Sequence, residues 1–166
     1  MLQALNPSSA LQLSVTLALF GVAGVGGTLL GGWAADRFGA VRAMRVQLTL
    51  LVTMMAVLPL TRGHPLATQV TLTVWGLAGF GLMTPQQSLL ASLSAAQAPL
   101  LLSLNASMLY VGTALGAVIS GALLEPLGLA RLGWTGLPFG LLALLTLAFD
   151  RAGPRPLPSA AASPAR

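Results

Sequence analysis

The chain has 166 residues, of which 55% are hydrophobic and only 7% are charged. Soluble domains carry about 25% charged residues, so this composition excludes a soluble globular protein and indicates an integral membrane protein. The net charge of +5 results from three acidic residues and eight basic ones, all of the basic ones arginines scattered between apolar stretches. They form no basic patch with interleaved aromatic residues, so no nucleic-acid partner is expected. The absence of cysteine excludes disulfides and cysteine metal sites.

Five apolar segments are long enough to be transmembrane helices, since about 20 helical residues cross the hydrocarbon layer. Residues 1–9, which include Pro7, are expected to form an extracytoplasmic loop. The predicted spans within a domain of residues 10–150 are 10–35, 43–61, 66–91, 100–124 and 134–149. Residues 151–166 carry four prolines among alanines and serines and are expected to be a disordered cytoplasmic tail. The predicted fold is therefore all-α, a polytopic transmembrane helix bundle of five spans in contact with lipid.

Glycine pairs recur in two of the spans. Gly27 and Gly31 are four residues apart in the first span, and Gly112 and Gly116 have the same spacing in the fourth. Small residues at this spacing allow two helices to approach closely inside a membrane. We therefore expect these four glycines to serve helix packing.

The arginines predict an orientation in the membrane. Six lie in loops on one side of the five predicted spans, and two lie on the other: Arg37, Arg42, Arg45, Arg151, Arg155 and Arg166 against Arg62 and Arg131. Because cytoplasmic loops are enriched in basic residues, the larger group is expected in the cytoplasm. This predicts a multi-pass protein of the inner or plasma membrane, with its N-terminus outside and its C-terminus in the cytoplasm.

Amide side chains interrupt the third and fourth spans. Gln86 and Gln87 precede the end of the third span, and Asn105 follows the start of the fourth. Gln86 and Asn105 are each about 7–8 Å inside the predicted cytoplasmic boundary. Because an unpaired amide is costly in lipid, we expect Gln86, with Gln87, to face Asn105 or a shared water-filled cavity. The alternative is a hydrogen bond that only stabilises packing. Tyr110 is a candidate substrate-facing aromatic residue.

The ionisable side chains do not indicate an enzyme. Asp36, Glu125 and Asp150 lie at the ends of predicted spans, and the single histidine, His64, lies in a loop. Catalytic sites need convergent nucleophilic or ionisable groups, and no such group of residues is evident within the spans. We expect no catalytic residue, metal or cofactor.

One charged stretch between the first two spans resembles a known motif. The pattern Gly32-x-x-x-Asp36-Arg37-x-Gly39-x-x-Arg42 resembles the signature loop of the major facilitator superfamily, roughly Gly-x-Leu-Ala-Asp-Arg-x-Gly-Arg-Lys. Ala40 and Val41 stand where that family usually has two basic residues. The resemblance implies that this loop locks one conformation of a transporter.

The later spans resemble one branch of that family. Leu104 to Gly116 is similar to the eleventh helix of arabinose-efflux-like drug:H⁺ antiporters, and Pro85-Gln86-x-x-Leu89-Leu90 is similar to the tenth. The resemblance implies a partial C-terminal lobe comprising helices eight to twelve of a twelve-helix transporter. It further implies alternating-access efflux of a small-molecule substrate, with any proton coupling in the missing half. That N-terminal half would be a partner if encoded separately. The alternatives are a non-transporting packing or assembly subunit and an inactive truncated fragment.

Overall fold

The computed structural model describes residues 10–149, apart from the side chains of residues 129 and 130, and these residues form helices without any strand. In chain order the elements are α2 (Ala10–Phe38), α3 (Ala40–Val57), η1 (Leu58–Thr61), α4 (Pro65–Leu93), α5 (Ala98–Arg131), η2 (Leu132–Gly136) and α6 (Leu137–Phe149). Five segments are long and apolar enough to cross a membrane: Ala10–Phe38, Ala40–Thr61, Pro65–Leu93, Ala98–Gly128 and Leu132–Phe149. The predicted fold class is confirmed. The predicted loop 1–9 and tail 151–166 lie outside the described residues.

The junction between α2 and α3 is shorter than the sequence suggested. Asp36 and Arg37, expected in a loop, form the last turn of α2, and Gly39 alone separates the two helices. Gly39 has a φ of 89°, a left-handed conformation that residues with a Cβ rarely adopt. Its N–H still donates to the carbonyl oxygen of Ala35 at 2.9 Å, so the hydrogen-bonding pattern of α2 continues up to the junction.

The fourth span is longer than predicted. Residues 125–131 were expected to belong to a loop, but α5 continues through Pro126 and ends at Arg131. Proline removes only one helical hydrogen bond, so a helix can pass through it when the surroundings allow. The break comes instead at Gly128, whose φ of 69° and ψ of 160° are not helical. The first residues of the predicted fifth span form the short 3₁₀-helix η2.

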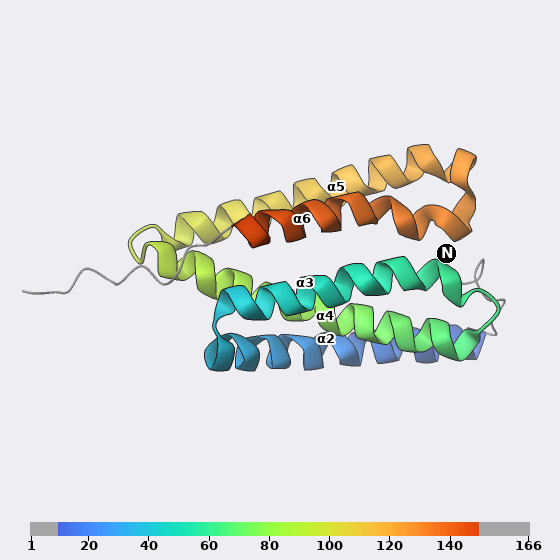
Figure 1. Ribbon diagram of the computed structural model, residues 1–166, viewed down its shortest axis with the longest axis horizontal. Helices are drawn as coiled ribbons and strands as arrows, with labels where there is room; N and C mark the ends of the chain where they lie inside the picture. The colour runs from blue at the N-terminus through green and yellow to red at the C-terminus, as the bar shows by residue number, and fades with distance from the viewer. Residues whose placement is uncertain (1–9, 150–166) are drawn as a thin grey trace, which may run out of the picture.

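Helices α2, α3 and α4 form a close-packed group (Figure 1). Between α2 and α4, aromatic rings lie over glycines of the opposite helix. A Cβ on Gly76 would lie 2.7 Å from the ring of Phe20, and one on Gly24 would lie 3.0 Å from the ring of Phe80. The two phenylalanines also meet edge to face, with ring centroids 5.9 Å apart. Each ring therefore fills space that only a glycine leaves free.

Further along the same interface, the backbones themselves touch. A Cβ on Gly27 would overlap the carbonyl oxygen of Leu77, and a Cβ on Gly31 would overlap that of Gly81. Pro85 is fully buried and lies four residues after Gly81, so it offers no N–H to the Gly81 carbonyl. The proline therefore frees the carbonyl that faces Gly31.

Two buried hydroxyls of this three-helix group are satisfied locally, whereas Gln47 Oε1 and Trp75 Nε1 are buried without a hydrogen-bond partner among the described residues. At the turn between η1 and α4, the hydroxyls of the buried Thr61 and Thr68 lie 2.8 Å apart, and Thr61 also donates to the carbonyl oxygen of Leu58 at 2.7 Å. Hydroxyl groups paired in this way are not available to a ligand.

Helix α6 is tied to α3 near both of its ends. The indole N–H of Trp134, in η2 before α6, donates to the carbonyl oxygen of Ala56 at 3.2 Å. At the other end, Arg45 of α3 donates from Nε and Nη2 to the carbonyl oxygen of Leu147, at 3.1 and 2.7 Å. Trp134 and Arg45 thus fasten α6 to α3.

Helix α5 packs much less than the others. It leaves α4 at the turn between Leu93 and Ala98 and runs back along the bundle to η2 (Figure 1). It contacts α4 near that turn and η2 at its far end, and none of its described side chains is buried. The fold is thus a tight group of α2, α3 and α4, with α6 fastened to it and α5 largely open.

Candidate functional site

Gln86 of α4 and Asn105 of α5 meet at one depth in the bundle. Gln86 is seven residues before the end of α4 at Leu93, and Asn105 is seven residues after the start of α5 at Ala98, about 10 Å from either helix end. Gln86 Nε2 donates to Asn105 Oδ1 at 2.8 Å, a good hydrogen-bond distance, and both side chains are half-buried. The contact expected between these two amides is present. Their role in binding remains a prediction.

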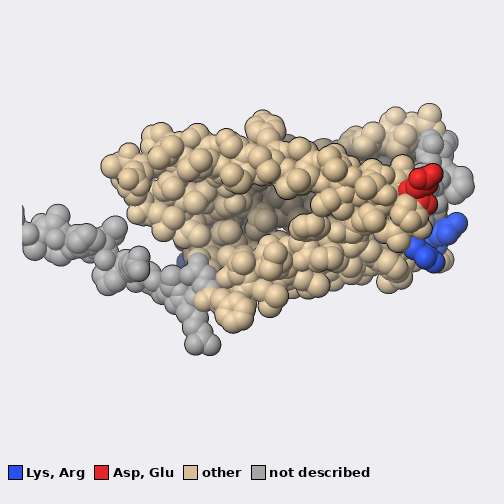
Figure 2. All heavy atoms as spheres, turned by 90° about the horizontal axis from the view of Figure 1, so that it is seen from above, with Lys and Arg blue, Asp and Glu red and all other residues tan. Residues whose placement is uncertain are grey.

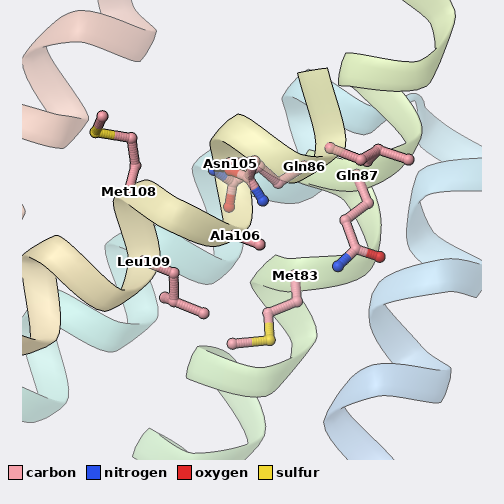
Figure 3. Close-up of a pocket in the computed structure, with 8 residues that line it drawn as sticks. Met83, Gln86, Gln87, Asn105, Ala106, Met108 and Leu109 are labelled. Atoms are coloured by element: carbon pink, nitrogen blue, oxygen red, sulfur yellow. Dashed lines mark hydrogen bonds between the residues drawn. The ribbon is translucent and has the colours of Figure 1, made fainter. Parts of the chain in front are cut away.

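A cavity of about 410 Å³ lies beside this hydrogen bond, between α4 and α5 (Figure 3). The amide of Gln87, the next residue on α4, also lines it, and no hydrogen bond to the Gln87 side chain is present among the described residues. The remaining walls are apolar. The complete lining is Met83, Gln86, Gln87, Leu102, Asn105, Ala106, Met108 and Leu109.

The sequence identified the amides of this cavity but not its walls. Met83, Met108 and Leu109 were not predicted as site residues, because apolar residues inside an apolar span carry no signal of their own. Helical spacing from the amides finds them: Met83 is three residues before Gln86, and Leu109 is four residues after Asn105.

Tyr110 does not line the cavity. It lies five residues after Asn105, which turns its side chain well away from the side of α5 that faces α4. It is 75% exposed in the described chain. A role for Tyr110 in binding therefore has to involve a surface other than this cavity.

The residues of the signature-like motif lie at one end of the bundle. Asp36, Arg37, Gly39 and Arg42 are exposed at the α2–α3 junction, and within residues 10–149 no ion pair joins their side chains to any other residue. Gly32 is half-buried, and a Cβ there would lie 3.4 Å from the methyl group of Thr84. The charges face outward, so the predicted conformational lock remains a prediction.

Arg45 has a contact that the sequence did not indicate. Its two hydrogen bonds to the Leu147 carbonyl oxygen satisfy a backbone acceptor in the last turn of α6, where a positive charge also interacts favourably with the helix dipole. The two residues are 102 positions apart. No local pattern links residues at such a separation.

The four predicted packing glycines fall into two groups. Gly27 and Gly31 are buried against the backbone of α4. Around Gly112 and Gly116 of α5, no atom of the described residues lies within 4 Å of where a Cβ would stand. The packing role of this second pair stays a prediction.

Among the described residues, the charged side chains lie away from the cavity. Arg37, Arg42 and Arg45 lie around the α2–α3 junction, and Arg62 and Arg131 lie at the opposite end of the bundle. Figure 2 shows one face of the molecule. The charged side chains visible on this face lie toward its two ends, and none is visible in the middle. Long apolar helices with charges at their ends and an amide-lined cavity between them define a polytopic helical membrane protein.

Comparison with known proteins places the chain in a family. The family model described as the Major Facilitator Superfamily matches residues 1–165, so the chain belongs to that superfamily. It is 32% identical over 124 residues to the uncharacterized MFS-type transporter YbcL of Bacillus subtilis (strain 168), an alignment that covers 75% of this chain and 32% of YbcL. It is 28% identical over 137 residues to the inner membrane transport protein YdhP of Escherichia coli (strain K12), covering 82% of this chain and 34% of YdhP. The chain thus spans about a third of the length of the curated relatives it matches. No solved structure matches it significantly.

Proposed function

We propose that the chain is the C-terminal part of a secondary active transporter that exports a small molecule by alternating access. Its five spans correspond to helices eight to twelve of a twelve-helix protein, and an N-terminal half supplies the rest of the transport path. Membership of the Major Facilitator Superfamily supports transport as the activity. Transporters of this kind rock two halves around a site within the membrane.

The observation that carries the proposal is the amide-lined cavity between α4 and α5. Amides at membrane depth are costly and tend to line a substrate path or a wet cavity. The volume of about 410 Å³ falls in the range typical of small-molecule pockets. The cavity also lies where the bundle is least tightly packed, next to the open helix α5. A rocking mechanism requires such a helix to change its neighbours without unfolding.

The experiment uses a strain of the source organism that lacks the gene, complemented with wild type, Asn105→Leu or Gln69→Leu. Gln69 is the matched control because it also carries a carboxamide side chain on a spanning helix, α4, but lies outside the cavity. Intracellular and extracellular small molecules are compared by mass spectrometry at equal membrane protein levels. At least one compound should accumulate inside the deletion strain and be exported again with wild type and Gln69→Leu, but not with Asn105→Leu. If Asn105→Leu restores export as fully as wild type, the cavity is not on the path. A subunit that only assists assembly would give that result.

Orientation is the second part of the proposal, with the N-terminus outside and the C-terminus in the cytoplasm of the cell membrane. The arginines of the α2–α3 junction lie at the opposite end of the bundle from Arg62 and Arg131, as the charge rule requires. The chain has no cysteine, so Arg42→Cys and His64→Cys each introduce a single thiol. An impermeant thiol reagent applied to intact cells should label His64→Cys and leave Arg42→Cys unlabelled. The reverse pattern would invert the orientation.

A further inference from the structure

The amides around the cavity retain unused hydrogen-bonding capacity. Gln86 and Asn105 share one hydrogen bond of 2.8 Å. Each carboxamide has two N–H donors and an oxygen that can accept two hydrogen bonds, so this one contact leaves both kinds of group free on the pair. Gln87 adds a third carboxamide on the same side of α4. The cavity therefore offers donors and acceptors together, which distinguishes it from a site that holds only anions or only cations.

None of the described residues that line this cavity carries a charge. The ionisable side chains of the described residues are Asp36, Arg37, Arg42, Arg45, Arg62, His64, Tyr110, Glu125 and Arg131, and none of them is among the lining residues. An ion transferred to this depth would lose its hydration without gaining a counter-charge from α4 or α5, which is strongly unfavourable. An uncharged ligand loses much less solvation and can recover it through the amides.

The apolar walls suit a ligand body of no single fixed shape. Met83 and Met108 contribute thioether side chains, and Leu102, Ala106 and Leu109 complete the apolar lining. Methionine is unbranched and adapts to irregular shapes, which is why it is frequent at surfaces that bind varied partners. The labelled side chains in Figure 3 come from both α4 and α5, so a bound molecule would touch both helices.

We infer that this cavity binds an uncharged molecule in which a carboxamide-like group, able both to donate and to accept hydrogen bonds, is joined to an apolar body. This inference rests on the proposed function and narrows its substrate class. The polar group of the ligand bonds to Gln86, Gln87 and Asn105, and the apolar body lies against the two methionines and Leu109. A carboxylate or an ammonium group on the same body should bind more weakly, because α4 and α5 offer it no counter-charge at the cavity.

The test compares three six-carbon probes that differ only in the end group: hexanamide, hexanoate and hexylammonium. The thiol of an Ala106→Cys variant reports on the cavity, because Ala106 lines it and the chain has no other cysteine. Ala114→Cys is the matched control, an alanine on the same helix outside the cavity. The rate of N-ethylmaleimide labelling of the full chain is measured in membrane vesicles from cells that produce it, with and without each probe.

Hexanamide at saturation should slow labelling of Ala106→Cys several-fold, because a molecule bound in the cavity covers the thiol. Hexanoate and hexylammonium should change it less than twofold, and labelling of Ala114→Cys should not respond to any probe. In the Ala106→Cys chain, a second substitution, Gln86→Leu, should abolish the protection by hexanamide. Gln69→Leu in the same chain should leave this protection intact. An unchanged labelling rate when the same second substitutions are made in the Ala114→Cys chain shows that the helix is still folded.

A second variant tests the charge argument in the opposite direction. Gln86→Glu places a carboxylate in the cavity, and hexylammonium should then protect Ala106→Cys more than hexanamide does. If hexanoate or hexylammonium protects the Gln86-containing chain as well as hexanamide, the inferred substrate class is wrong, although the cavity remains a binding site. If no probe protects at the cavity in any variant, including Gln86→Glu, the cavity is not a binding site and the proposed function loses its main support.

Discussion

Helices α2 and α5 are both long, apolar and glycine-containing, yet the structure uses them in different ways. Glycines of α2 lie against the backbone of α4, whereas Gly112 and Gly116 of α5 have no atom of the described residues near them. Ala23, Gly24, Gly27 and Gly31 of α2 are buried, and no described side chain of α5 is. A pattern of small residues therefore permits close packing, but only a partner helix of matching shape produces it.

Two hydrogen-bonded pairs, one in the group of α2, α3 and α4 and one at the boundary of α4 and α5, differ in a similar way. The Thr61 and Thr68 hydroxyls of the three-helix group are buried and bonded to each other, so they contribute only to the structure. Gln86 and Asn105 share one hydrogen bond beside a cavity and keep free donors and acceptors. We interpret α2, α3 and α4 as the scaffold, and the α4–α5 boundary as the part that carries function.

The largest expected effect is at the glycine contacts of the scaffold. A methyl group at Gly31 would overlap the Gly81 carbonyl oxygen, and backbone cannot move aside as a flexible side chain can. Gly31→Ala should lower the free energy of unfolding by at least about 2 kcal/mol, the cost of overpacking a close contact. Gly116→Ala, in open space, should leave it unchanged or raise it by up to about 1 kcal/mol through helix propensity. Unfolding by sodium dodecyl sulfate in mixed micelles measures both, and equal losses would remove the distinction between the two helices.

A smaller effect is expected at the link between α3 and α6. Arg45→Gln removes two charge-assisted hydrogen bonds to the Leu147 carbonyl oxygen and should destabilise the docking of α6 by about 1.5 kcal/mol. The control is Arg42→Gln, because Arg42 is exposed on the same helix. Hydrogen exchange of the last amides of α6 should quicken in Arg45→Gln and stay unchanged in Arg42→Gln. If both variants exchange at the wild-type rate, Arg45 does not hold α6.

The smallest effect on stability is expected at the cavity. Gln86→Leu removes one interhelical hydrogen bond, which in membranes contributes about 0.6 kcal/mol on average. The free energy of unfolding should therefore change by less than half of the loss in Gly31→Ala, in the same micelle assay. A loss as large as that of Gly31→Ala would make the amide pair part of the scaffold and remove the reason to assign it a separate role.

Much of this organisation follows from the sequence, because the membrane restricts what an apolar segment can do. The five spans follow from the lengths of the apolar segments. The Gln86–Asn105 contact follows from equal depth on two consecutive helices joined by a short turn, and the structure shows the hydrogen bond. Charged residues at the ends of the spans follow from the cost of burying them in lipid.

The remaining features depend on three-dimensional contacts that no local pattern encodes. Arg45 meets Leu147 only because α6 folds back onto α3. The reduction of the α2–α3 loop to Gly39 depends on one left-handed residue, and a glycine-rich segment contains many candidates for it. Tyr110 lies outside the cavity because the face of α5 that meets α4 is set by packing, which no local pattern reveals.

We propose that the amides at the α4–α5 boundary serve transport more than stability. The most direct measurement is the initial rate of transport of the exported compound in vesicles containing equal amounts of wild type or Asn105→Leu. The rate should fall about tenfold at substrate concentrations well below saturation, as expected for the loss of about 1.4 kcal/mol of binding. The free energy of unfolding should change by less than about 1 kcal/mol. A transport rate equal to that of wild type in a stably folded Asn105→Leu protein would show that the amide pair is not on the transport path.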